Sequence, residues 1–210
     1  MELNNTSRYI ELCFRLNSAC MVGCENTVDQ LIELGADINN LYYHVTPLYT
    51  ACKYGRTNIV KKLLSFGADI NKISETSACI FFGNFHFTPF NIACRNRCKD
   101  IVDLLIKAGA DINKVYNRKA IHLASDSLDI IKTLIRAGAD IEATQGDGKS
   151  ILHINCEKGN VDIIEFLIDA GVDCSVKDKL GHDPLWYLMD SSASDDEKIR
   201  LKALIDRSNG

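Results

Sequence analysis

The sequence predicts an all-α protein made of stacked helix-turn-helix units, and three observations carry this prediction. First, a short turn phrase that begins with glycine recurs along the chain. Its glycines are separated by 32, 42, 29 and 33 residues and stand at Gly35, Gly67, Gly109, Gly138 and Gly171. Second, two runs of apolar residues at helical spacing precede each of these glycines. Third, a threonine–proline pair opens the first run in two of the copies, as is typical of a helix N-terminus. Because one such unit cannot bury its apolar side alone, the copies are expected to stack into a solenoid.

Residues 46–71 show why each unit should fold as two helices. Thr46 can accept a hydrogen bond from a backbone N–H of the first turn, and Pro47 follows at the first helical position, where a missing N–H loses no hydrogen bond. Gly55 and Gly67 tolerate the left-handed conformation that ends each helix. The apolar side chains expected inside are Leu48, Ala51, Cys52, Ile59, Val60, Leu63 and Leu64.

The repeated phrase reads Thr-Pro-Leu-Tyr-Thr-Ala-Cys at residues 46–52 and Gly-Ala-Asp-Ile-Asn at residues 67–71. It resembles the ankyrin repeat, whose period is about 33 residues. The resemblance covers nearly the whole chain and implies an ankyrin-repeat solenoid with β-turn fingers, in which the first and last repeats are caps. The six repeats are expected over residues 7–40, 42–72, 84–114 (after a long finger over 73–87), 115–143 (a shortened repeat), 146–176 and 178–207.

The sequence also predicts where the first helix begins and where the last helix lies. Thr6 or Ser7 is expected to begin the first helix, and the last helix is expected over residues 198–206. Ser194 is followed three residues later by Glu197, a spacing that predicts a capping box at the start of that last helix. The acidic residues after Ser194 also leave open a site for an acid-directed kinase.

Composition favours a soluble protein inside the cell. The chain is 46% hydrophobic and 25% charged and has three prolines, which argues against disorder. Its net charge of −4 argues against nucleic-acid binding, which needs a basic footprint. Neither a signal peptide nor an apolar stretch of the roughly 20 residues needed to span a bilayer is visible. We therefore expect a cytoplasmic monomer without a membrane partner, while a nuclear location, or a host cytosol if the protein is an effector, stays open.

The cysteines and histidines favour a structural interpretation over a catalytic or metal site. Four of the nine cysteines share one position of the repeat and are expected as small buried side chains: Cys20, Cys52, Cys94 and Cys156. His122 and His153 stand at the fourth place of the opening phrase, where the resemblance implies a hydrogen bond between neighbouring repeats. We expect no catalytic residue, no metal and no cofactor, and hence no enzyme.

One polar position of the repeat is a candidate for covalent modification. Asn39, Asn71 and Asn113 each end the closing phrase, and each has a leucine eight residues earlier. In the ankyrin family an asparagine at this place can be hydroxylated by an oxygen-dependent hydroxylase, so the resemblance implies possible hydroxylation. A role as a turn residue explains these asparagines equally well.

The resemblance also implies where a partner protein binds, namely on the finger tips and the exposed side of the first helices. Carried over position by position, the partner-binding residues are Tyr42, Tyr43, Val45, Lys53, Tyr54, Phe85, Phe87, Arg95, Asn96, Tyr116 and Arg118. Tyrosine and arginine often dominate binding energy, so repeats 2 to 4 are expected to bind most strongly. Phe81 and Phe82 of the long finger either join this surface or only stiffen the finger. The later repeats contribute ordinary charge around Asp147, Lys149, Glu157, Lys158, Leu180 and His182.

The function expected from these features is a non-catalytic scaffold that binds a partner protein through its concave ankyrin surface. One alternative is a substrate-recognition adaptor of a ubiquitin ligase, which the short chain after the last helix disfavours. Another is a host-directed microbial or viral effector, for which the abundance of isoleucine, asparagine and lysine is a weak indication. The sequence does not name the partner.

Overall fold

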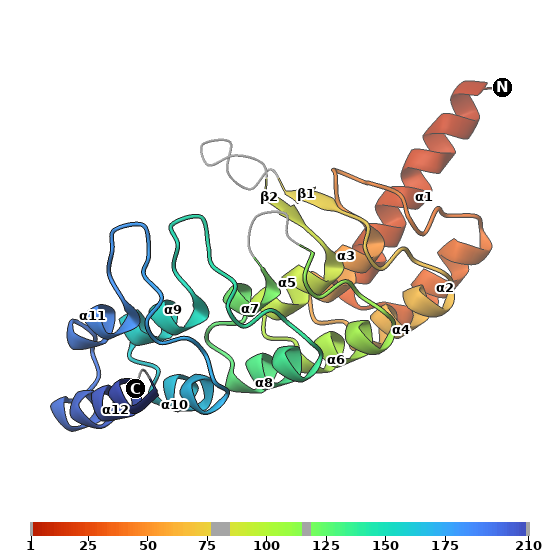
Figure 1. Ribbon diagram of the computed structural model, residues 1–210. Helices are drawn as coiled ribbons and strands as arrows, with labels where there is room; N and C mark the ends of the chain where they lie inside the picture. The colour runs from red at the N-terminus through yellow and green to blue at the C-terminus, as the bar shows by residue number, and fades with distance from the viewer. Residues whose placement is uncertain (1, 77–84, 115–118, 209–210) are drawn as a thin grey trace. The chain divides into compact units, whose positions relative to one another are not determined.

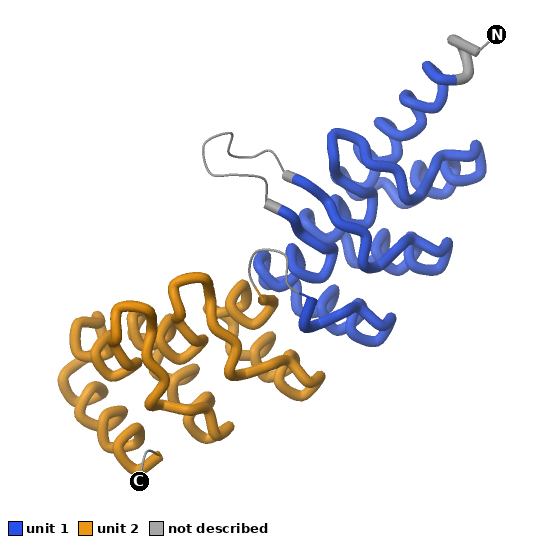
Figure 2. The backbone as a smooth tube through the Cα atoms, turned by 45° about the horizontal axis from the view of Figure 1, so that its top comes forward, with its two compact units in different colours: residues 1–117 blue, residues 118–210 orange. Residues whose placement is uncertain are grey.

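The computed structural model describes residues 2–76, 85–114 and 119–208 (Figure 1). The chain divides into two compact units, residues 1–117 and residues 118–210 (Figure 2). Each unit consists of consecutive helix pairs. In each unit, helices that open a pair pack against one another.

The described part of unit 1 contains three helix pairs and one two-stranded sheet. Its elements are α1 (Glu2–Val22), α2 (Glu25–Glu33), α3 (Pro47–Lys53), α4 (Thr57–Ser65), β1 (Ser74–Thr76), β2 (Phe85–Phe87), α5 (Pro89–Arg95) and α6 (Lys99–Lys107). The first helices pack in the order α1, α3, α5, and the second helices pack in the order α2, α4, α6. This arrangement buries the apolar stripes of both helix rows between them.

The pair formed by α3 and α4 folds as its sequence predicts. The Thr46 hydroxyl accepts a hydrogen bond from the backbone N–H of Tyr49 at 3.1 Å, and Gly55 follows α3 with a φ of 68°. The apolar side chains expected inside are fully buried, apart from Leu64, which is only partly buried. In the next pair, Arg97 stands at the place of Gly55 and also has a left-handed φ, of 59°.

The first helix is much longer than expected. α1 begins at Glu2 and runs for 21 residues, so the prediction that Thr6 or Ser7 begins it is wrong. The physical reason is that no proline or glycine interrupts the chain before Gly23, so nothing stops the helix from extending toward the N-terminus. Residues 6–11 of α1 are exposed, and burial begins at Cys13.

The long finger contains an antiparallel strand pair. β1 and β2 pair with Ser74 opposite Phe87 and Glu75 opposite His86, and they lie side by side in Figure 1. The buried Ser74 hydroxyl accepts a hydrogen bond from the backbone N–H of Thr46 at 3.1 Å. This contact ties the base of the long finger to the start of α3. Residues 77–84, which include Phe81 and Phe82, lie outside the described residues.

Residues 119–208, the described part of unit 2, contain three further helix pairs. Its elements are α7 (Ala120–Leu123), α8 (Leu128–Arg136), α9 (Ile151–Lys158), α10 (Val161–Asp169), α11 (Pro184–Met189) and α12 (Asp195–Ser208). The first helices pack in the order α7, α9, α11, and α12 packs on α10. α12 is longer at both ends than the predicted 198–206. It begins directly after Ser194, and the structure confirms the capping box: the Ser194 N–H donates to the Glu197 carboxylate at 2.8 Å, and the Glu197 N–H donates to the Ser194 hydroxyl at 3.4 Å.

The two histidines of the opening phrase bond to the following finger, as the resemblance implies. The Nε2 atom of His122 lies 2.9 Å from the carbonyl oxygen of Ala143. The Nε2 atom of His153 lies 3.2 Å from the carbonyl oxygen of His182. The Ser150 N–H donates to Nδ1 of His153 at 3.2 Å; Nε2 therefore carries the ring proton and donates it to the carbonyl.

Candidate protein-binding surface

A groove of about 180 Å³ lies on unit 1 between α1, the finger at residues 42–45 and α3. Five of the predicted partner-binding residues line it: Tyr42, Tyr43, Val45, Lys53 and Tyr54. Two of them are strongly exposed, with 79% of Tyr43 and 44% of Tyr54 accessible to solvent. The structure thus brings the finger tip and the end of α3 together around one hollow.

The finger tip is held in an unusual backbone conformation. Tyr42 and Val45 exchange two backbone hydrogen bonds, of 3.1 and 3.2 Å, which closes a two-residue turn. Tyr43 and His44, the two residues of this turn, have φ values of 47° and 65°. Hairpin turns with two positive φ values favour asparagine and glycine, and a bulky residue there is a genuine outlier. Unit 1 therefore presents an aromatic ring at a position where glycine would be less strained.

Aromatic rings line one side of the groove. The Phe14 and Tyr42 ring centroids lie 5.5 Å apart, and the Tyr42 and Tyr43 centroids lie 4.6 Å apart in an edge-to-face arrangement. Both distances are in the range of favourable aromatic pairs. At the other side, the Lys53 ammonium lies 5.6 Å from the Tyr54 ring centroid. The groove therefore has apolar walls with one cation at its edge.

The sequence interpretation missed six lining residues, which come from α1 and the inner side of α3: Phe14, Asn17, Ser18, Met21, Tyr49 and Thr50. Phe14 and Met21 are 49% and 40% exposed and stand seven residues apart, so they share one helix face. That spacing could have revealed them. They were missed because the first repeat was interpreted as a cap and its outer face was not considered. Tyr49 is buried, and burial raises its pKa to about 12.

Three other predicted residues belong to repeat 3 and do not line the groove: Phe87, Arg95 and Asn96. Phe87 is only 6% exposed, so the expectation that it is part of the exposed surface is corrected. Its ring packs at the base of the finger, with the Arg95 guanidinium 5.5 Å from its centroid. The Asn96 side chain donates to the carbonyl oxygen of Lys53 at 2.7 Å and so links α5 to α3. Nothing is described of the Phe85 side chain, and Tyr116 and Arg118 lie outside the described residues.

The candidate hydroxylation sites have a structural role that the sequence interpretation missed. The Asn39 side-chain oxygen accepts a hydrogen bond from the backbone N–H of Asp69 at 2.8 Å. Asn71 makes the same contact with the N–H of Asp111 at 3.1 Å. In unit 2 a glutamate takes over this contact, since Glu142 accepts from the N–H of Asp173 at 2.9 Å. These side chains link neighbouring repeats. Asn113 occupies the same repeat position, and hydroxylation of all three asparagines stays a prediction.

The four cysteines that share one repeat position are fully buried, as predicted. Burial raises the pKa of Cys20 to about 12 and also raises the pKa values of Cys52, Cys94 and Cys156. A thiol that keeps its proton is neither a nucleophile nor a metal ligand. Among the described residues, no three His, Cys, Asp or Glu side chains are grouped so that they could hold a metal ion.

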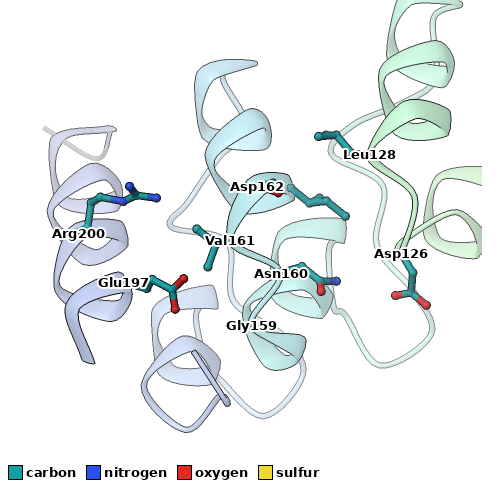
Figure 3. Close-up of a pocket in the computed structure, with 9 residues that line it drawn as sticks. Asp126, Leu128, Gly159, Asn160, Val161, Asp162, Glu197 and Arg200 are labelled. Atoms are coloured by element: carbon teal, nitrogen blue, oxygen red, sulfur yellow. The ribbon is translucent and has the colours of Figure 1, made fainter. Parts of the chain in front are cut away.

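A second hollow, of about 540 Å³, lies on unit 2 between the start of α8, the turn before α10 and α12 (Figure 3). Its lining is mostly polar, unlike that of typical ligand pockets. Three of its four charged side chains, all except Asp162, are engaged within the unit: Asp126 pairs with Lys158, Arg200 pairs with Glu165, and Glu197 forms the capping box of α12. These three groups stabilise the repeat turns.

Comparison with known families agrees with the repeated helix pairs. The family described as ankyrin repeats (3 copies) matches the chain over residues 14–74, 74–145 and 121–201. Ankyrin repeats are generally protein-binding modules and are typically non-catalytic. No helix among the described residues is both long enough and apolar enough to cross a membrane. Because the matches extend over most of its length, the chain belongs to the ankyrin-repeat family.

Proposed function

We propose that this protein is a non-catalytic interaction module that binds a partner protein in the groove of unit 1. The observation that carries the proposal is Tyr43, whose ring is 79% exposed on a backbone with a positive φ. Strained conformations of this kind cluster at binding and active sites. Tyrosine is also among the residues that most often dominate binding energy.

The size of the groove favours a protein partner over a small-molecule ligand. Pockets for drug-sized ligands measure about 300–1,000 Å³, whereas this groove measures about 180 Å³. Such a volume suits one or two side chains of a partner. The exposed rings of Phe14, Tyr43 and Tyr54 supply the apolar contact area. The preferred anchor is therefore an aromatic or large aliphatic side chain that enters between α1 and α3.

Affinity capture from cell lysate with mass spectrometry tests the proposal. The wild type is compared with a Tyr43→Ala/Tyr54→Ala variant. The matched control is Leu34→Ala/Phe66→Ala, because these two apolar side chains are 53% and 50% exposed and do not line the groove. Melting temperatures of all three proteins verify that the folds are intact.

We expect a protein that the wild type and the control variant capture and that the tyrosine variant loses. Its identity then separates a scaffold from a ubiquitin-ligase adaptor or a host-directed effector. Capture of the same proteins by the tyrosine variant would refute the groove as the binding site. Loss in the control variant to the same degree would also refute it, because the effect would then not be specific to the groove.

A further inference from the structure

Unit 2 carries a second exposed aromatic surface, which differs from the groove of unit 1 in charge. Leu180, Trp186 and Met189 are 76%, 50% and 44% exposed. A hollow of about 350 Å³ lies beside Trp186 and is lined by Glu157, Leu180, His182, Trp186, Tyr187 and Asp190. The expectation that the later repeats present only ordinary charge is therefore wrong. We call this site the Trp186 groove.

The aromatic side of the Trp186 groove is rigid. The His182 ring stacks on Trp186 with centroids 3.8 Å apart and an angle of 2° between the ring planes. The Tyr187 ring packs edge-to-face against Trp186 at 4.9 Å, and its hydroxyl donates to Asp178. Trp186 is thus held in place while half of its surface stays exposed. A partner that binds it gains contact area without ordering the indole.

The charge of this surface favours a cation. Two carboxylates, those of Glu157 and Asp190, line the Trp186 groove, and no lysine or arginine among the described residues does. The Lys149 ammonium lies at its edge, 4.1 Å from the Tyr187 ring centroid and 2.8 Å from Glu157, so a cation already occupies one aromatic face next to one carboxylate. Asp190 is exposed, and within the described part of the chain no basic side chain pairs with it.

The net negative charge of unit 2 also favours binding of a cation. Residues 118–210 contain 17 Asp and Glu residues and 12 Lys and Arg residues, whereas residues 1–117 contain 11 and 12. A cation approaching unit 2 is therefore attracted by the unit as a whole as well as by Asp190.

We propose that the Trp186 groove binds a basic segment of a protein, in which an arginine stands beside a leucine-like side chain. The guanidinium stacks on the open side of Trp186 and pairs with Asp190. Tryptophan is the aromatic side chain that binds cations best, and arginine is the usual cation. The neighbouring aliphatic side chain packs on Leu180. This binding is independent of the unit 1 groove, which has a lysine at its edge and no carboxylate in its lining.

Trp186 is also the only tryptophan of the chain, so its fluorescence reports the occupancy of this site directly. The full chain is titrated with a blocked peptide in which two arginines alternate with leucines. A matched peptide carries glutamates in place of the arginines. We expect a saturable change in Trp186 emission with the arginine peptide and binding at least tenfold weaker with the glutamate peptide.

Asp190→Asn tests the pairing, and Asp169→Asn is its matched control, because Asp169 is exposed on α10 and does not line the groove. Both variants lose one negative charge from unit 2. We expect Asp190→Asn to raise the Kd of the arginine peptide about five- to tenfold. Asp169→Asn should change this Kd less than twofold. The Tyr43→Ala/Tyr54→Ala variant should bind the arginine peptide as the wild type does, which separates this proposal from that for unit 1.

Four results would overturn the proposal. The first is equal binding of the arginine and glutamate peptides, and the second is an equal effect of Asp190→Asn and Asp169→Asn, which would indicate only general attraction. The third is no saturable change in emission. The fourth is an emission change that depends on protein concentration without peptide, which would assign the surface to a second copy of this chain.

Discussion

The backbone strain at the finger tip leads to a prediction in which stability and binding respond differently. The left-handed conformation costs a non-glycine residue about 1–2 kcal/mol, and Tyr43 and His44 both adopt it. Glycine removes that strain but loses about 0.5–1 kcal/mol through its greater freedom in the unfolded chain. His44→Gly should therefore stabilise unit 1 by about 0.5–1 kcal/mol.

Tyr43→Gly should leave the free energy of unfolding nearly unchanged, because it also removes the edge-to-face contact with Tyr42, which is worth about 0.5–1.5 kcal/mol. Tyr43→Gly should nevertheless weaken binding, since truncation of a dominant binding residue costs about 2 kcal/mol or more of binding free energy. That corresponds to a roughly 30-fold higher Kd for the partner of unit 1. His44→Gly should leave this Kd within about twofold, because His44 does not line the groove.

The assay is thermal unfolding of both variants together with a titration of the captured partner. A change of 1 kcal/mol shifts Tm by roughly 2–4 °C in a chain of this size. If Tyr43→Gly lowered Tm by more than about 4 °C, the tyrosine would be holding the finger together, and the link between strain and binding would be refuted. Unchanged binding by Tyr43→Gly would refute its role as an anchor.

Three further predictions test the fold by thermal unfolding. Arg97→Gly should leave unit 1 about 0.5–1 kcal/mol more stable than Arg97→Ala, because both variants lose the same side chain and only the alanine keeps the left-handed strain; equal Tm values for the two would contradict this. Gly148→Ala should destabilise unit 2 more than Gly171→Ala, because both glycines have a positive φ but only at Gly148 would a Cβ meet backbone, the N atom of Lys179 at 2.8 Å. Burial lowers the pKa of His153, so the native state holds fewer protons there than the unfolded chain does. Its contribution to stability should be complete above the ordinary pKa of about 6.5 and decline as the pH falls below it. His153→Asn should flatten this decline, and an unchanged pH profile would contradict the assignment.

The helix pairs could be predicted from the sequence because the residues that begin and end each helix act within that helix. Thr46 caps α3 through its own hydroxyl, and Gly55 ends the same helix by its own backbone freedom. The length of α1 was mispredicted because residues such as Thr6 and Ser7 act as N-caps only where the preceding chain is not helical. No breaker precedes them.

The candidate surfaces were only partly predictable because exposure depends on which helices pack together. Tyr42 and Tyr54 could be assigned to the surface from their repeat positions, whereas the strained φ of Tyr43 follows from the two hydrogen bonds that close its turn. Among the described helices, α11 packs on α9 and α12, and no further first helix covers Trp186. A tryptophan at the same place in an inner repeat would be covered by the next helix. Nothing in its local sequence distinguishes these cases.

The most direct test of the central claim is hydrogen–deuterium exchange of the full chain, free and bound to the partner that the wild type captures. We predict that peptides over residues 14–21 and 42–54 gain protection in the complex, and that peptides over α2 and α4, which lie outside the groove, do not. Protection confined to α2 and α4, with the finger at residues 42–45 unchanged, would contradict the assignment of the unit 1 groove as the partner-binding site.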